Sequence, residues 1–170
     1  DMPTGVKIGA GSFNQDSKGR WYINCPVEVA TADHAPLTRV GIDLGLKNLA
    51  TLSDGSKIES PQFYRRYEQR LAVAQRAYNR QRVRRLHAKI ANCRRDFHHK
   101  TSTDLAARYA LIAVGNVNAK QLAQTRMAKS VLDAGWSTFL TMLKYKSAGY
   151  VEVEEKFTTQ TCSQCGALPP

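Results

Sequence analysis

The chain has 170 residues, of which 42% are hydrophobic and 23% are charged, and this composition is typical of one globular core with at most a small appendage. No stretch approaches the roughly 20 apolar residues that a membrane-spanning helix needs, so no membrane partner is expected. The net charge is +11 and the pI is about 9.8. Because each neutralised phosphate releases condensed counterions, this basic excess favours a nucleic acid as the partner.

Cysteines are few: they occur at positions 25, 93, 162 and 165, and only the last two form a Cys-x-x-Cys pair. A secreted disulfide framework needs a denser pattern in a smaller chain, so we predict a reducing, cytoplasmic setting. The first residues also lack the basic flank and apolar run of a signal peptide. A start at Asp1 and an end shortly after the cysteine pair suggest a fragment of a longer protein.

Strand-like sequence begins the chain. Residues 6–8 and 21–29 are rich in β-branched and aromatic side chains, and the turn-forming residues 14–19 lie between them. This pattern predicts a β-hairpin. We assign residues 1–36 to the strand-rich end of a preceding, wedge-like β domain.

Three antiparallel strands are predicted next. Residues 39–45, Arg-Val-Gly-Ile-Asp-Leu-Gly, have the composition of a buried strand interrupted by one acid, Asp43. Residues 49–52 and 57–58 continue as a meander around the turn Ser-Asp-Gly-Ser at 53–56.

A single long helix is predicted over residues 61–100. Ser60 followed by Pro61 is a favourable start, because a hydroxyl cap precedes a proline that has no N–H to satisfy. One apolar face follows at helical spacing, formed by Leu86, Ile90, Cys93 and Phe97. Most other positions are Arg, Lys, Gln or His.

The remaining elements complete an α/β pattern. Ser102 or Thr103 can cap a short helix, residues 110–114 predict a buried strand, residues 126–146 predict a helix with Gly135 as a tolerated weak point, and residues 150–154 predict a strand. The apolar face of the 126–146 helix is formed by Met127, Val131, Phe139 and Leu143. The order predicts an RNase H-like mixed sheet with helices on both faces in residues 37–156, apart from a last helix expected beyond Pro170.

Asp43 is the first candidate for chemistry, because a carboxylate inside a buried strand is costly unless a partner compensates it. In a nuclease that partner is Mg²⁺ or Mn²⁺, held by two or three acids so that two ions activate a water and stabilise the leaving oxygen. The alternative is a strand-end acid that is solvated or caps a turn. Gly-Ile-Asp-Leu-Gly also opens the phosphate hairpin of actin-like ATPases, but the hydroxyl residue and further glycines usual there do not follow.

Three segments, in order, resemble the TnpB family of insertion-sequence proteins, which are similar to type V CRISPR effectors. Residues 41–55 resemble the first RuvC motif, residues 88–102 resemble the family's long helix, and residues 158–166 resemble the opening of its zinc ribbon. The resemblance implies an RNA-guided DNA endonuclease with guide RNA and target DNA as partners and a nucleoid-associated, prokaryotic location. It also implies a truncated zinc ribbon at 157–170, in which Cys162 and Cys165 supply two of the four ligands of a structural Zn²⁺.

The chain departs from the family pattern at Gly115, where most relatives have a metal-binding Glu. Either the site is inactive or another carboxylate replaces that Glu. Glu154 and Glu155, at the end of the last strand, are the candidates, and only one should point inward because side chains alternate along a strand. We favour Glu155, with Glu154 as the alternative, while both acids could simply be solvated.

The basic residues cluster in the predicted long helix, where like charges three and four residues apart repel one another. A polyanion would relieve that repulsion, whereas the alternative is a solvated helix face. The predicted nucleic-acid contacts are Arg76, Arg80, Arg82, Arg84, Arg85, Lys89, Arg94, Arg95 and Lys100. Tyr64, Tyr67 and Tyr78 are candidates for stacking on bases.

Two functions remain open. The first is a metal-dependent, RNA-guided DNA nuclease core with a relocated glutamate. The second is a nuclease-inactive derivative that binds guide RNA and DNA as a targeting module or repressor.

Overall fold

The computed structural model describes residues 9–16, 19–27, 38–117, 122, 124–154 and 164. The chain divides into two compact units, Asp1–His34 and Ala35–Pro170, which are described separately. Within the described residues, no helix has the length and apolar character needed to cross a membrane.

The first unit contains an antiparallel hairpin of β1 (Ser12–Gln15) and β2 (Trp21–Asn24). The carboxylate of Asp16 closes the turn by accepting hydrogen bonds from the backbone N–H and the Nε of Arg20. A hairpin is present as predicted, but its first strand is Ser12–Gln15, which overlaps the predicted turn at 14–19, and its second strand ends at Asn24 rather than at residue 29. Pro26 cannot donate to a strand partner, which accounts for the early end. The predicted strand at residues 6–8 lies outside the described residues.

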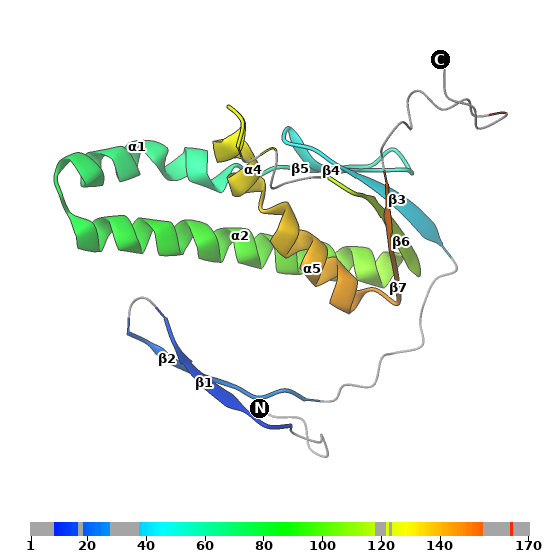
Figure 1. The fold of residues 1–170 in the computed structure, drawn as a ribbon, viewed down its shortest axis with the longest axis horizontal. Coiled ribbons are helices and arrows are strands. Elements are labelled where there is room, and N and C mark those ends of the chain that lie inside the picture. The colour runs from blue at the N-terminus through cyan, green and yellow to red at the C-terminus, as the bar shows by residue number, and fades with distance from the viewer. Residues whose placement is uncertain are drawn as a thin grey trace. The chain divides into compact units, whose positions relative to one another are not determined.

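The second unit contains a five-stranded mixed sheet in the order β5-β4-β3-β6-β7 (Figure 1). The strands are β3 (Arg39–Leu44), β4 (Asn48–Leu52), β5 (Lys57–Glu59), β6 (Leu111–Gly115) and β7 (Gly149–Val153). β3, β4 and β5 are antiparallel neighbours, whereas β6 and β7 run parallel to β3. The predicted α/β mixed sheet is therefore confirmed.

The apolar core lies on one face of this sheet. Val40, Ile42 and Leu44 of β3 are buried, and they alternate with Gly41 and Asp43 on the opposite face. The buried face packs against α2 (Arg80–Arg108), α4 (Ala128–Ala134) and α5 (Trp136–Lys146). The core residues from these helices are Leu105, Val131, Ala134, Trp136, Phe139 and Leu143. Within the described residues the helices thus cover one face and leave the Asp43 face open.

The predicted single helix over residues 61–100 is wrong, because two antiparallel helices occupy this region. α1 (Phe63–Arg76) is followed by a three-residue turn and then by α2. The N–H of Asn79 bonds the carbonyl of Ala74, and the N–H of Tyr78 bonds that of Gln75. These two bonds form a Schellman motif, in which Tyr78 takes the left-handed conformation with a φ of 51°.

Asn79 has a second role in the same turn, because its side chain accepts a hydrogen bond of 2.9 Å from the N–H of Arg82. It therefore caps the start of α2. The predicted apolar face of α2 is confirmed by its packing on α1, with Ile90 buried and the rings of Phe63 and Phe97 6.1 Å apart. An asparagine followed by a run of helix formers was the overlooked signal for a new helix.

Two further helix boundaries differ from the prediction. α2 continues through Ser102, which is buried rather than capping a separate helix. The predicted helix over residues 126–146 is divided into α4 and α5 at Gly135, whose φ is 63°. Val131, Phe139 and Leu143 are buried as predicted, but Met127 is 55% exposed.

Gly135 is required by the close approach of α2. A Cβ at this position would lie 2.7 Å from Cδ of Arg94 and 3.0 Å from Cε1 of His98.

Gly135→Ala should therefore destabilise the fold by about 2 kcal/mol or more, combining left-handed backbone strain with displaced side chains. Gly55→Ala is the matched control, because Gly55 also has positive φ but a Cβ there would meet no atom within 4 Å. Equal losses of free energy of unfolding in urea would contradict this account of Gly135.

Candidate functional site

Asp43 lies in a row of residues that crosses four strands on the open face of the sheet. Asp43 pairs with Thr51 of β4, and Gly115 of β6 pairs with Val153 of β7. Because Ile42 pairs with Val114, the next step of the parallel register brings Asp43 beside Gly115. Asp43, Thr51, Gly115 and Val153 all line one shallow surface hollow of about 420 Å³.

The carboxylate of Asp43 is exposed, unlike the buried acid that the strand pattern predicted. The burial penalty that first singled out this residue therefore does not apply. Hydroxyl groups lie close by: Thr51 pairs with Asp43, and Oγ of Ser53 accepts a 3.0 Å hydrogen bond from the N–H of Gly41. An exposed carboxylate in a hollow can bind a cation or orient a water without first giving up an internal partner.

The second acid of the predicted site is not found among the described residues. Position 115 is a glycine, which offers no side-chain ligand, and the described part of the chain contains no group of three or more His, Cys, Asp or Glu side chains able to hold a metal. Glu154 is described and exposed. Glu155, Cys162 and Cys165 lie outside the described residues.

Side chains alternate between the two faces of the sheet along β7. Tyr150 packs against the core, and its hydroxyl lies 3.1 Å from Oε1 of Glu152, so these two side chains share the helix-covered side of the strand. Val153 lines the Asp43 hollow on the other side. β7 ends at Val153, so Glu154 comes directly after the last strand residue on the Asp43 side.

The second candidate site is the helical hairpin formed by α1 and α2. These helices contain thirteen Lys or Arg and three Asp or Glu, so their net charge of +10 accounts for nearly all of the chain's +11. Every predicted nucleic-acid contact except Arg94 is exposed. The hairpin therefore concentrates the chain's positive charge on one structural element.

Some of these cations already have partners within the chain. Arg94 is half-buried and pairs with Asp133 at 3.3 Å, and Lys100 pairs with Asp96 at 2.8 Å. Nζ of Lys89 lies over the ring of Tyr67, 5.5 Å from its centroid. Arg94 therefore connects α2 to α4, and its predicted role as a nucleic-acid contact is the least supported of the set.

The first two turns of α2 have the opposite character. Arg80, Arg82, Arg84 and Arg85 are exposed, and no acidic side chain within the described residues pairs with them. The first turn of α2 contains no acid, although the positive end of a helix dipole favours negative charge there. The arginines repel one another and are also repelled by the positive end of the helix dipole. A bound anion would relieve both repulsions, so this end of the hairpin is a favourable surface for one.

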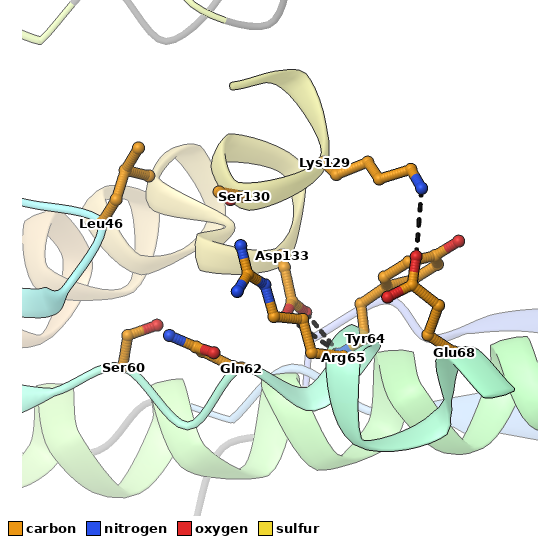
Figure 2. A pocket seen from close by; sticks show the side chains of 9 residues that line it. All are labelled: Leu46, Ser60, Gln62, Tyr64, Arg65, Glu68, Lys129, Ser130 and Asp133. Atoms are coloured by element: carbon orange, nitrogen blue, oxygen red, sulfur yellow. Dashed lines mark hydrogen bonds and ion pairs between the residues drawn. The ribbon is translucent and has the colours of Figure 1, made fainter. Parts of the chain in front are cut away.

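A pocket of about 300 Å³ lies where the start of α1 meets α4 (Figure 2). Asp133 is nearly buried there, and its two carboxylate oxygens each accept a 2.9 Å hydrogen bond from the N–H of Tyr64. Lys129 reaches across to Glu68 at 3.0 Å. The pocket is lined by Leu46, Ser60, Gln62, Tyr64, Arg65, Glu68, Lys129, Ser130 and Asp133.

Asp133 performs the capping role that the sequence assigned to Ser60. α1 begins at Phe63, and Gln62 before it has a left-handed backbone and makes no side-chain cap. The cap comes instead from α4, 69 residues later in the chain. Because Asp133 and Lys129 already have partners, and the pocket shares no residue with the Asp43 hollow, we assign this pocket to the packing of the hairpin on the core.

Comparison with known proteins identifies the family. The family model OrfB_IS605, described as "Probable transposase", matches residues 22–126, which is more than half of the chain. The chain belongs to the OrfB (TnpB) family. A second model, "Cas12f1-like, TNB domain", matches residues 136–169. The first match contains Asp43 and the whole helical hairpin, and the second contains α5, β7 and the cysteine pair.

Curated relatives agree with this assignment. A "Putative RNA-guided DNA endonuclease" from Streptomyces pristinaespiralis is 33% identical over 98% of this chain and 46% of its own length. The "Putative RNA-guided DNA endonuclease InsQ" of Escherichia coli (strain K12) is 31% identical over 88% of this chain and 46% of its own length. The chain thus spans about half the length of these relatives.

Among solved structures, a chain of a Cas12f1-sgRNA-target DNA complex resembles this TnpB-family chain with a TM-score of 0.49 and 14% identity. The match covers 90% of this chain and 44% of the other.

His98 of this TnpB-family chain lies at the junction of α2 with α4 and α5. It is 1% exposed, and its ring lies 5.5 Å from that of Phe139. Burial, with the nearby charges of Arg94 and His99, lowers its pKa from 6.5 to about 4. His98 is therefore a neutral residue of the helix packing.

The folded state should lose stability as the pH falls from 6.5 to 4. The unfolded chain takes up a proton on His98 near pH 6.5, whereas the folded chain resists it until the pH reaches about 4. The loss at low pH should approach about 3 kcal/mol at most. His98→Phe should remove this part of the pH dependence, with a constant offset for the altered packing. Chemical denaturation of both proteins between pH 4 and 8 tests this, and parallel curves would refute it.

Proposed function

We propose that this chain carries the nucleic-acid-binding, RuvC-type core of an RNA-guided DNA endonuclease. The observation that carries the proposal is the position of Asp43: an exposed carboxylate at the carboxyl end of the central strand, on the open face of the sheet. Two relatives that match nearly the whole chain bear the name of RNA-guided DNA endonucleases, which supports the same function. Guide RNA and target DNA are the proposed partners.

In this proposal Asp43 and Glu155 would hold Mg²⁺ or Mn²⁺, since both ions prefer carboxylate oxygens. When bound, such ions activate a water and stabilise the leaving oxygen of a phosphodiester. Asp43 would orient the metal from the centre of the row, and the open hollow would admit the sugar-phosphate backbone. Glu155 lies outside the described residues.

The alternation of β7 supports Glu155 over Glu154. Val153 lies on the Asp43 side of β7, and the acid two positions further along the sequence is Glu155. Glu154 follows Tyr150 and Glu152, which share the opposite side. A relocated glutamate on the neighbouring strand could therefore replace the ligand that position 115 lacks.

The nuclease-inactive alternative rests on Gly115. This residue lies beside Asp43 in the row, where the resemblance to the family predicts a metal-binding Glu. A chain that kept the basic hairpin but had only one effective carboxylate would bind guide RNA and DNA without cutting. Such a protein would act as a targeting module or repressor.

Cys162 and Cys165 are proposed to belong to a zinc ribbon, within the segment that matches the Cas12f1-like TNB model. A structural Zn²⁺ needs four ligands, so a second pair of ligands would have to complete the site.

Cleavage by the complete protein with its guide RNA distinguishes the two functions. With Mg²⁺, the wild type should cut a matched DNA target, and Asp43→Ala and Glu155→Ala should each reduce the rate by at least a hundredfold because the metals lose a ligand. Glu154→Ala is the matched control and should cut at close to the wild-type rate.

Gly115→Glu provides a rescue test. Added to Glu155→Ala, it should restore part of the cleavage, because it returns a carboxylate to the position beside Asp43. A wild type that binds its target but never cuts would establish the inactive alternative. Normal cutting by Glu155→Ala would show that the relocated ligand is wrong.

Nucleic-acid binding by the hairpin is tested separately. Replacing Arg80, Arg84 and Arg85 together with Ala should weaken RNA binding and make the salt dependence of log K shallower by about 2 to 3, if each contacts one phosphate. The control triple variant replaces Arg20, Arg108 and Lys129, which already pair with Asp16, Asp104 and Glu68. Both variants lose three charges, so equal effects would mean that only net charge matters.

A further inference from the structure

Tyr78 lies in the turn that joins α1 to α2. This turn forms the tip of the helical hairpin, at the end remote from the sheet (Figure 1). Its side chain is 90% exposed, the largest exposure among the large hydrophobic residues of the described chain. Tyr64 and Tyr67, by contrast, are partly buried and lie against Lys129 and Lys89. Within the described residues, no hydrogen bond or ring contact engages the Tyr78 side chain.

The turn that presents Tyr78 is closed by its own backbone. The Schellman bonds of Tyr78 and Asn79 measure 3.0 Å each, and the N–H of Arg80 bonds the carbonyl of Tyr78 at 2.9 Å. The Asn79 cap then fixes the first turn of α2. The turn therefore holds the Tyr78 backbone in one conformation, and the aromatic ring contributes nothing to closing it.

Tyrosine is an unfavourable residue for this position. The left-handed residue that follows a helix is most often glycine, because a side chain there is strained, and Tyr78 has φ of 51°. The ring is also left in water, where its apolar surface gains nothing. A strained backbone and an unused aromatic ring at one position favour a role in binding.

The surroundings of the ring specify the ligand. Arg76 ends α1 and Arg80 begins α2, so cations flank Tyr78 on both sides, and Arg82 and Arg84 follow on α2. An exposed aromatic ring between arginines matches a nucleotide, since a base can stack on the ring while phosphates contact the guanidinium groups. A base paired inside a duplex cannot offer its face, so the ligand must be unpaired.

We propose that Tyr78 stacks on an unpaired base of a bound nucleic-acid strand, with the arginines at the hairpin tip contacting the adjoining phosphates. This inference rests on the proposed nucleic-acid-binding function and adds a defined base contact to it. The hairpin thereby presents a rigid stacking residue at its tip rather than only a diffuse basic surface.

Tyr78→Gly separates binding from folding, because glycine suits the left-handed position. The variant should unfold at the same urea concentration as the wild type or higher, yet bind a single strand roughly tenfold more weakly, as expected for one lost stacking contact. The salt dependence of binding should not change, since no charge is removed. Tyr78→Phe should retain wild-type affinity, and Tyr145→Ala, which removes another exposed tyrosine beside lysines, serves as the control.

The probes are single-stranded RNA and single-stranded DNA containing 2-aminopurine, whose fluorescence is quenched by stacking, and a blunt duplex with the analogue in its interior. A Tyr78-dependent loss of affinity and quenching with either single strand supports the proposal and shows which strand is bound. An equal loss with the duplex, or no loss with either single strand while the Arg80, Arg84 and Arg85 variant binds weakly, overturns the Tyr78 proposal alone. Failure of the wild type to bind any probe at low salt overturns the hairpin interface as well.

Discussion

The parallel pairing of β3 with β6, over an apolar core on one side only, is the constraint on which the candidate site depends. Burying Val40, Ile42 and Leu44 forces the intervening residues of β3 to the other face, so Asp43 must be exposed there. The register between β3 and β6 then determines that Gly115 is its neighbour. A shift of one residue would turn Asp43 into the core, where its charge could not be accommodated.

The helical hairpin depends on a second junction, at Asp133. This one carboxylate caps α1 through the N–H of Tyr64 and pairs with Arg94 of α2, so it joins both hairpin helices to α4. Nearby, Gly135 allows α2 to approach the break between α4 and α5, with His98 packed against it. The basic surface of the hairpin is thereby held on the same folded unit as the Asp43 row, although the two sites share no residue.

Local patterns predicted the parts of the fold that depend on local interactions. The strands around Asp43, the apolar face of α2 and the mixed sheet follow from alternation and helical spacing, and the family followed from short motifs. The errors arose where distant contacts decide. No local pattern reveals that Asp133 replaces Ser60 as the cap of α1. The turn at Tyr78 was missed because a tyrosine, rather than the usual glycine, occupies its left-handed position. Asp43 was selected as a buried acid, whereas its exposure is what suits it to bind a cation.

The central claim is that the row through Asp43 holds the metal-binding site, and Mn²⁺ titration of this chain followed by NMR tests it most directly. The paramagnetic ion should selectively broaden the backbone signals of Asp43, Thr51, Gly115 and Val153, and leave those of Tyr78 and Arg80 at the hairpin tip unchanged. Asp43→Ala should abolish the selective broadening. Broadening that persists in Asp43→Ala, or that centres on Asp96 and Asp104 instead of the row, would contradict the account.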